Sequence, residues 1–234
     1  MNDGEIDDIL QRAAKAQPEV DPALLERVSR LVGAAGASLA PVRPLPPAWL
    51  LAAASIALSA ALAVAGALIL GPAGVRQMNA LQAGWIFPLL SALLWLAAAL
   101  CVAEAIPGSR RPVAPWVLGT AACLLLAAVF GLVFPDHHTE RFVPQGIRCL
   151  TAGLAQAVPA SLGSWLILRR GFAVHPAASG FARGVLAGLA GVLMLELHCA
   201  NFEAPHVIVW HIGVLPLAGL AGMALSRRRP AAPR

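Results

Sequence analysis

The chain has 234 residues, of which 59% are hydrophobic and only 12% are charged, and its formal net charge is +5. Soluble globular chains carry about 25% charged residues. Apolar runs recur here from Ala48 almost to the end of the chain, so the composition excludes an ordinary soluble domain. The basic residues stand near the ends of these runs, so they indicate membrane orientation, and we expect no direct contact with nucleic acid.

Residues 1–47 contain no apolar run of membrane-spanning length, and we interpret them as a short cytoplasmic tail. The first residues are acidic and lack the basic and apolar regions of a cleavable signal peptide, so none is expected. A second helix is predicted to begin at Asp21-Pro22, because Asp caps helices and Pro suits the first helical position. A first short helix is indicated by apolar residues at helical spacing, namely Ile6, Ile9, Leu10 and Ala13.

The second predicted helix is amphipathic. Its apolar stripe consists of Leu24, Leu25, Val28, Leu31 and Val32. The stripe has two interpretations: it lies on the membrane surface or on the bundle itself, or it docks into the groove of a cytoplasmic protein. We predict a small-residue linker at 33–40 and a stiff, proline-rich segment at 41–47 before the membrane.

Six apolar runs follow the tail, each close to the ~20 residues that a helix needs to cross a bilayer. We place them at 48–70, 84–106, 114–134, 147–168, 180–197 and 205–225. The predicted fold is an all-α membrane protein, a six-transmembrane-helix bundle over 48–226 with a short amphipathic N-terminal tail and a basic tail at 227–234. Gly180, Gly184 and Gly188 are spaced by four, which predicts a close-packing face on the fifth helix.

The basic residues predict the orientation of the bundle. If the N-terminus is cytoplasmic, 14 of the 17 Lys and Arg residues lie on the cytoplasmic side. The three on the other side are Arg76, Arg141 and Arg148. This bias follows the positive-inside rule, and an even number of spans places both termini in the cytoplasm. In a Gram-negative bacterium the protein would lie in the inner membrane, and the opposite face would be the periplasm.

Two of the four cysteines are candidates for chemistry. Cys101 and Cys123 lie inside predicted helices, where cysteine usually acts as a small apolar residue. Cys149 begins the fourth run and Cys199 ends the fifth, so both are predicted at the outer face, where disulfides persist. Consecutive antiparallel helices pack side by side, so the two thiols are a candidate redox switch, disulfide or metal site.

Most of the histidines are predicted at the same outer face. Cysteine and imidazole suit soft or borderline metals such as zinc, although imidazoles also tolerate a wet membrane interface. Glu196 lies near the end of the fifth run, where it could be hydrated or pair with Arg148. The candidate metal ligands beside the two cysteines are His137, His138, His198, His206 and His211.

The sequence also lacks several catalytic patterns. It has no glycine-rich phosphate loop, no recognisable Ser/His/Asp arrangement and no charged relay in the middle of a run, so no enzymatic step is expected. One alternative is a six-span transporter of small solutes or metals, with the outer cysteines and histidines as its entrance. A membrane thiol oxidoreductase is less favoured, because that class usually presents a Cys-x-x-Cys pair, which is missing here.

Four segments of the chain form a recognisable pattern. They are Pro41-Val42-Arg43-Pro44-Leu45, Arg148-Cys149-Leu150-x-x-Gly153-Leu154 with Pro159, Leu168-Arg169-Arg170-Gly171 with Pro176 and Gly180, and Leu197-His198-Cys199 with Trp210. Together they resemble the NrsF family, membrane-embedded negative regulators of bacterial extracytoplasmic-function sigma factors. The resemblance covers roughly 41–225, and its most specific parts are the Arg-Cys and His-Cys segments.

The resemblance implies an inner-membrane anti-sigma factor whose partners are an extracytoplasmic-function sigma factor and the lipid bilayer. The tail would hold the sigma factor away from RNA polymerase, and Cys149 and Cys199 would sense oxidative or heavy-metal stress. No cofactor is required, and a transition-metal ion, zinc or another heavy metal, is expected only as a signal. The tail is longer than is usual in the family, and we assign partner binding to its second helix through Leu24, Leu25, Val28 and Leu31.

Overall fold

The computed structural model describes residues 7–8, 11–12, 21–37, 45–111, 113–137 and 141–227. The chain forms two compact units, Met1–Pro44 and Leu45–Arg234, which we describe separately. Most of the first predicted helix, including Ile6, Ile9 and Leu10, lies outside the described residues, as do His138 and residues 228–234.

The first unit contains helix α2, Pro22–Ala37. It begins as predicted, because the Asp21 carboxylate accepts a hydrogen bond of 2.9 Å from the Ala23 backbone nitrogen. The predicted linker at 33–40 is wrong over 33–37, where alanines, the best helix formers, let the helix continue. All five stripe residues are exposed, by fractions of 48–65%.

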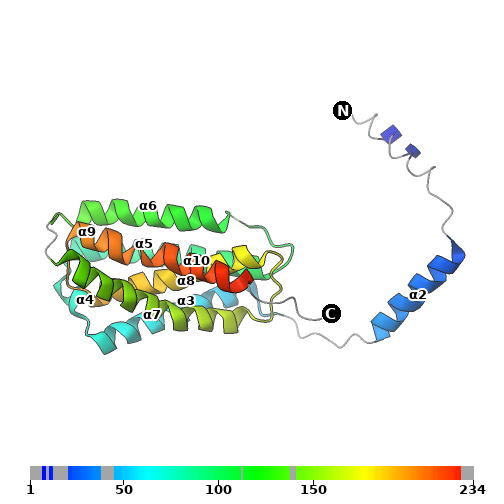
Figure 1. Cartoon of the computed structure of the whole chain (residues 1–234), viewed down its shortest axis with the longest axis horizontal. Coiled ribbons are helices and arrows are strands. Elements are labelled where there is room, and N and C mark those ends of the chain that lie inside the picture. Colours follow the sequence, from blue (N-terminus) through cyan, green and yellow to red (C-terminus); the bar gives the residue numbers. More distant parts are fainter. Residues whose placement is uncertain are drawn as a thin grey trace. The chain divides into compact units, whose positions relative to one another are not determined.

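The second unit is a bundle of six helical segments that are long and apolar enough to cross a membrane, which confirms the predicted fold class. The sixth segment, Ala204–Arg227, is interrupted by a π-helical turn, η1, Val207–His211, and a short helix α4, Ala73–Gln77, follows the first segment. The elements, shown in Figure 1, are α3 (Ala48–Leu70), α5 (Ala80–Ala105), α6 (Pro115–Val133), α7 (Phe142–Leu168), α8 (Pro176–His198), α9 (Ala204–His206) and α10 (Val214–Arg227).

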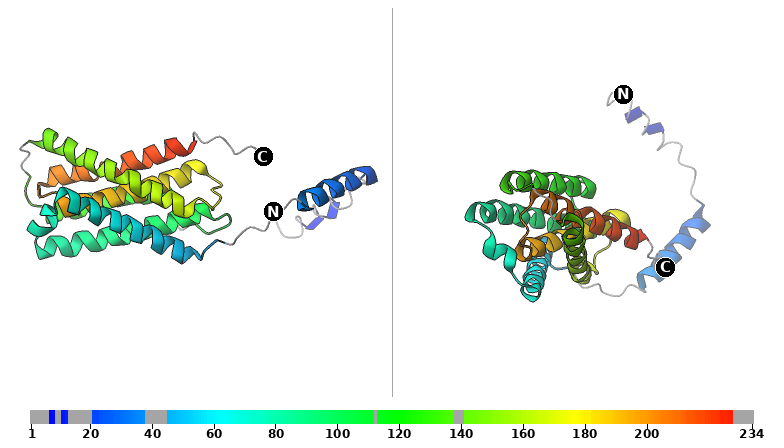
Figure 2. Two further views of the ribbon diagram at one scale, coloured as in Figure 1. Left: turned by 90° about the horizontal axis from the view of Figure 1, so that it is seen from below. Right: turned by 60° about the vertical axis from the view of Figure 1, so that its left-hand side comes forward.

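Helix α8 is the most buried element of the bundle. It packs against α3, α5, α7 and α10, and the helices run side by side in all three ribbon views (Figures 1 and 2). Its contact with α10 uses the predicted glycine face: a Cβ at Gly184 would collide with the backbone of Ala218, and one at Gly180 with Gly222. Small residues therefore let the two backbones touch.

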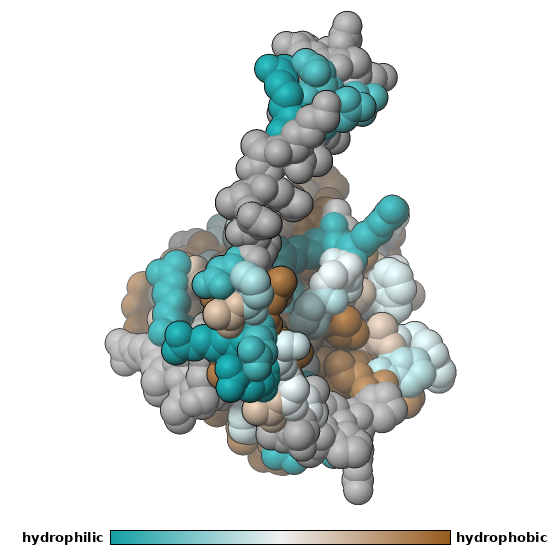
Figure 3. All heavy atoms as spheres, turned by 90° about the vertical axis from the view of Figure 1, so that its right-hand side faces the viewer, coloured by the Kyte–Doolittle hydropathy of each residue, from teal (hydrophilic) through white to brown (hydrophobic). Residues whose placement is uncertain are grey.

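One end of the bundle carries exposed basic side chains. The ends of α5, α7 and α10 meet there, and hydrophilic side chains gather on this face (Figure 3). The opposite end holds the start of α7, the end of α8, and α9. The basic residues of the first end include Arg110, Arg111, Arg169, Arg170 and Arg227.

Candidate functional site

Two cysteines and two histidines converge at the end of the bundle that lies opposite the basic face. Cys149 lies near the start of α7, Cys199 directly follows α8, and His206 and His211 belong to the sixth segment. One ligand atom from each of these residues lies within 4.8 Å of the others. We call these four residues the cysteine–histidine cluster.

The two sulfurs are close but not bonded. Cys149 Sγ lies 3.6 Å from Cys199 Sγ, and Cys199 Sγ lies 3.7 Å from His206 Nε2. A disulfide bond is about 2.05 Å long, so both residues are free thiols. The hydrogen bond to Cys149, followed by burial, raises the pKa of the Cys199 thiol above its ordinary value.

Glu196 belongs to the same site. It is only 2% exposed, and its Oε1 lies 2.7 Å from Nδ1 of His211, which is 1% exposed. This corrects the expectation that Glu196 is hydrated or pairs with Arg148. The other nitrogen of His211, Nε2, has no hydrogen-bond partner among the described residues, and neither has Nδ1 of the fully buried His206.

The π-helical turn brings the two histidines together. Residues five apart lie about 140° apart around an α-helix, which turns about 100° per residue. Here the Ile212 nitrogen donates to the Val207 carbonyl at 3.3 Å, a bond that widens the turn and brings His206 and His211 toward one side. Their rings meet edge to face, with centroids 5.3 Å apart.

Close packing holds α7 against this turn. Gly146 lies against the Trp210 ring and leaves no room for a Cβ, and the Trp210 and Phe142 rings have centroids 5.4 Å apart. A larger residue at position 146 would push Trp210 away from α7. Gly146 therefore helps to fix the distance between Cys149 and the histidines.

The loop between α8 and α9 is tied to its surroundings by hydrogen bonds. The Asn201 amide donates to Gln145 Oε1 at 3.0 Å and accepts from the Glu203 backbone nitrogen at 2.9 Å. The Ala204 nitrogen donates to the Asp136 carbonyl at 2.7 Å. These bonds fix the chain that joins Cys199 to His206.

A polar hollow of about 800 Å³ leads to the cluster. Cys149, Cys199 and His206 line it, together with charged side chains of both signs. The cluster is thus reachable by a small ion or oxidant, although its histidines are buried. The charged residues that line the hollow are Asp136, Arg141, Arg148 and Glu203.

Two of the other predicted ligands do not belong to the cluster, although His198 lines the same hollow. His198 places Nδ1 2.7 Å from the carbonyl of Gly71, so it fastens α8 to the end of α3. His137 is exposed, with Nδ1 2.7 Å from the carbonyl of Pro135. His138 lies outside the described residues. Four of the predicted residues are therefore brought together, and His198 and His137 are not among them.

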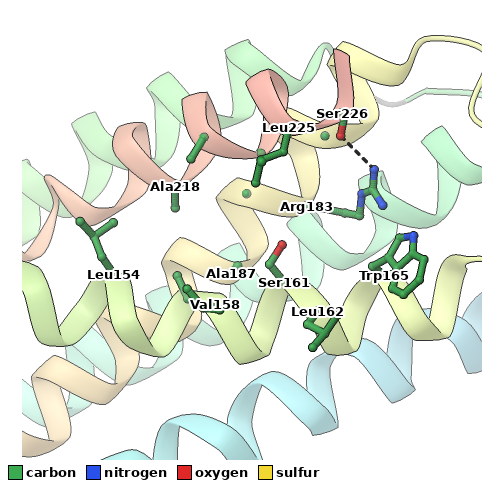
Figure 4. Close-up of a pocket in the computed structure, with 15 residues that line it drawn as sticks. Leu154, Val158, Ser161, Leu162, Trp165, Arg183, Ala187, Ala218, Leu225 and Ser226 are labelled. Carbon is green, nitrogen blue, oxygen red and sulfur yellow. Dashed lines mark hydrogen bonds between the residues drawn. The ribbon is translucent and has the colours of Figure 1, made fainter. Parts of the chain in front are cut away.

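A second cavity, of about 480 Å³, lies between α7, α8 and α10 (Figure 4). Leu154, Val158 and Leu162 of α7 line it, and Arg183 donates hydrogen bonds of 3.3 Å to the Ser226 hydroxyl and the Ser179 carbonyl. Ser161 and Trp165 add a hydroxyl and an indole nitrogen, the other lining residues are mainly apolar, and the cavity offers no set of metal ligands. Of the two cavities described, the polar hollow beside the cysteine–histidine cluster is therefore the one that holds candidate metal ligands.

Comparison with protein families identifies a match that covers most of the chain. The family model described as NrsF, negative regulator of sigma F, matches residues 36–229. The chain belongs to the NrsF family. The match confirms the resemblance and makes this chain a negative regulator of a sigma factor, with a sigma factor as its partner. NrsF proteins are regulators, which supports a role other than catalysis.

The matched region includes all six membrane-spanning segments and the whole cysteine–histidine cluster, but only the last residues of α2. The apolar stripe of α2 lies outside the matched residues. Comparison with curated proteins and with solved structures finds no match.

Proposed function

We propose that this NrsF protein is an inner-membrane anti-sigma factor that sequesters an extracytoplasmic-function sigma factor and releases it under heavy-metal or oxidative stress. The observation that carries the proposal is the family match over 36–229. The six membrane-spanning segments support a multi-pass membrane location for the regulator.

The orientation follows from the charges. The exposed arginines at one end of the bundle would face the cytoplasm by the positive-inside rule. Both termini are then cytoplasmic, and the cysteine–histidine cluster at the other end faces the periplasm. The protein thus has a signal-accepting end and a partner-binding end on opposite sides of the membrane.

The partner-binding segment is α2. Leu24, Leu25, Val28 and Leu31 form an exposed apolar stripe, which suits a helix that lies in a hydrophobic groove of its partner. The opposite face is polar and carries Glu26 and Arg30, whose charged groups are 3.8 Å apart. An amphipathic helix of this kind can bind a partner through its apolar face while its polar face stays in contact with water.

The signal would act on Cys149 and Cys199. A transition-metal ion such as zinc or another heavy metal would bind the thiols, or an oxidant would join them, and either event ties α7 to the end of α8. Both helices extend to the basic end of the bundle, so a change in their packing at the cluster can be transmitted to that end. The described residues offer no observation that favours a transporter or a thiol oxidoreductase.

Copurification and a reporter test this proposal. The full-length chain is purified from its own membranes, the copurifying sigma factor is identified, and a reporter driven by that sigma factor measures repression. We expect Leu24→Glu with Leu31→Glu to relieve repression, while the matched double variant Glu26→Ala with Arg30→Ala on the polar face keeps it. Full repression by the stripe variant at normal membrane levels would exclude α2 as the binding segment, and recovery of no sigma factor would contradict sequestration.

A further inference from the structure

We propose that Cys149, Cys199, His206 and His211 are the four ligands of a single divalent, thiol-seeking metal ion of the zinc and cadmium type, and that Glu196 positions His211 for this role. The inference deepens the sensing part of the proposed function by naming the ligand and its coordination. The site itself does not depend on sigma-factor binding, because it is argued from geometry alone.

Two distances in the cluster match those of a tetrahedral site. With Zn–S bonds of about 2.3 Å and Zn–N bonds of about 2.0 Å, two sulfurs lie about 3.8 Å apart, and a sulfur and a nitrogen about 3.5 Å apart. The sulfurs of Cys149 and Cys199 are 3.6 Å apart, and Cys199 Sγ is 3.7 Å from His206 Nε2. All four ligand atoms lie within 4.8 Å of one another, so side-chain movements of up to about 1 Å would close the coordination shell.

The hydrogen bonding of the two buried imidazoles also favours a metal site. Buried polar atoms are nearly always hydrogen-bonded, yet Nε2 of the buried His211 has no hydrogen-bond partner among the described residues. Glu196 Oε1 accepts the Nδ1 hydrogen of His211, which in a neutral ring leaves the lone pair on Nε2. Histidines that bind metals usually donate their second ring nitrogen to a carboxylate in this manner. Glu196 is therefore a positioning residue, which acts through His211.

A disulfide alone does not explain the site. Joining Cys149 to Cys199 would leave Nε2 of the buried His211 without a partner. Burying such groups without partners costs free energy. A metal ion gives each of the four ligands a role, and the polar hollow that Cys149, Cys199 and His206 line provides its access route.

The ion would join three parts of the chain. Its ligands come from α7, from the end of α8 and from the π-helical turn of the sixth segment. Binding would fix the relative positions of these three segments at one end of the bundle. This is a stronger constraint than a disulfide, which would join only α7 and the end of α8.

Cobalt titration tests the site in the full-length protein, purified in detergent with its thiols reduced. We expect one Co²⁺ per chain, absorption bands of tetrahedral cobalt, a sulfur-to-cobalt charge-transfer band, and displacement by zinc. Cys149→Ser or Cys199→Ser should weaken the charge-transfer band, and His211→Gln should weaken binding. His198→Gln is the matched control and should leave the titration unchanged, because His198 bonds to Gly71 instead.

Glu196 is tested by two variants. Glu196→Leu removes the acceptor for His211 and should lower cobalt affinity by about 10- to 100-fold, with the charge-transfer band retained at saturation. Glu196→Gln keeps an oxygen that accepts the Nδ1 hydrogen and should restore most of that affinity. Equal affinities for the wild type, Glu196→Leu and Glu196→Gln would overturn the positioning role.

X-ray absorption at the zinc edge of the wild-type protein decides the ligand set without any variant. Two sulfur and two nitrogen neighbours are expected, and failure to bind zinc, or a shell without both imidazoles, would overturn the proposal. The two claims fail separately. If the chain binds metal in this way but neither binds nor releases a sigma factor, the metal site stands and the proposed function is wrong. If the chain represses its sigma factor but binds no metal, the proposed function stands and the metal site is wrong.

Discussion

Replacing Gly184 by alanine should destabilise the bundle, because α8 and α10 touch backbone to backbone at this position. A Cβ at Gly184 would overlap the Ala218 carbonyl, which is backbone and cannot rotate away. The helices must therefore separate, and overpacking of this kind costs about 1–3 kcal/mol. The higher helix propensity of alanine recovers up to about 1 kcal/mol. We expect a net loss of about 1–2 kcal/mol in the free energy of unfolding.

The measurement is denaturant unfolding of the purified chain in detergent micelles, followed by tryptophan fluorescence. Gly131→Ala on α6 is the matched control, because a Cβ there would meet only Ile208 Cδ1 at 3.9 Å, an ordinary contact. This variant should be as stable as the wild type or slightly more stable. Equal midpoints for the two alanine variants would refute the claim that the Gly184 contact holds α8 against α10.

Three further predictions concern the cysteine–histidine cluster. Replacing both Cys149 and Cys199 by serine should abolish the stress response in a reporter assay while repression remains, and a response that survives would exclude thiol sensing. Glu196→Leu should raise the metal concentration for half-maximal response by about 10- to 100-fold, and an unchanged dose–response curve would contradict its positioning role. Gly146→Ala should displace Trp210 and weaken the cobalt charge-transfer band of the purified protein; an unchanged spectrum would show that this contact does not shape the site.

The six membrane-spanning segments could be predicted because each is a long apolar run. The starts of α5 and α7 could not, because these two helices begin in more polar sequence where hydropathy gives no signal. Helix α5 begins at Ala80 instead of 84, since Asn79 and Gln82 form a reciprocal capping box with hydrogen bonds of 2.9 and 2.8 Å. Helix α7 begins at Phe142 instead of 147, in a turn that contains Gln145.

The site could be predicted only in part. Cys149 and Cys199 stand at matching ends of consecutive helices, so their proximity follows from topology. Glu196 lies three residues before Cys199 and thus shares its side of α8, a spacing signal that the sequence contained. His198 is adjacent to Cys199 in the chain, and for that reason it points elsewhere on the helix surface.

The sequence predicted His211 as a candidate ligand, but not that it shares one side of its helix with His206. In a regular α-helix, residues five apart do not share a face, so His206 and His211 have no spacing that indicates a common site. Only the π-helical turn, with its bond from Ile212 to Val207, brings them together. No sequence pattern predicts such a turn.

The proposed mechanism requires the cysteine–histidine cluster and the partner-binding tail to lie on opposite sides of the membrane. This sidedness is measured by labelling single cysteines with an impermeant thiol reagent, in a chain whose four native cysteines are replaced by serine. His137→Cys marks the cluster end and Phe172→Cys the basic end, and both positions are exposed. We expect the reagent to label only His137→Cys in intact spheroplasts and to reach Phe172→Cys only in permeabilised membranes. Labelling of Phe172→Cys alone in intact spheroplasts would contradict the proposed orientation.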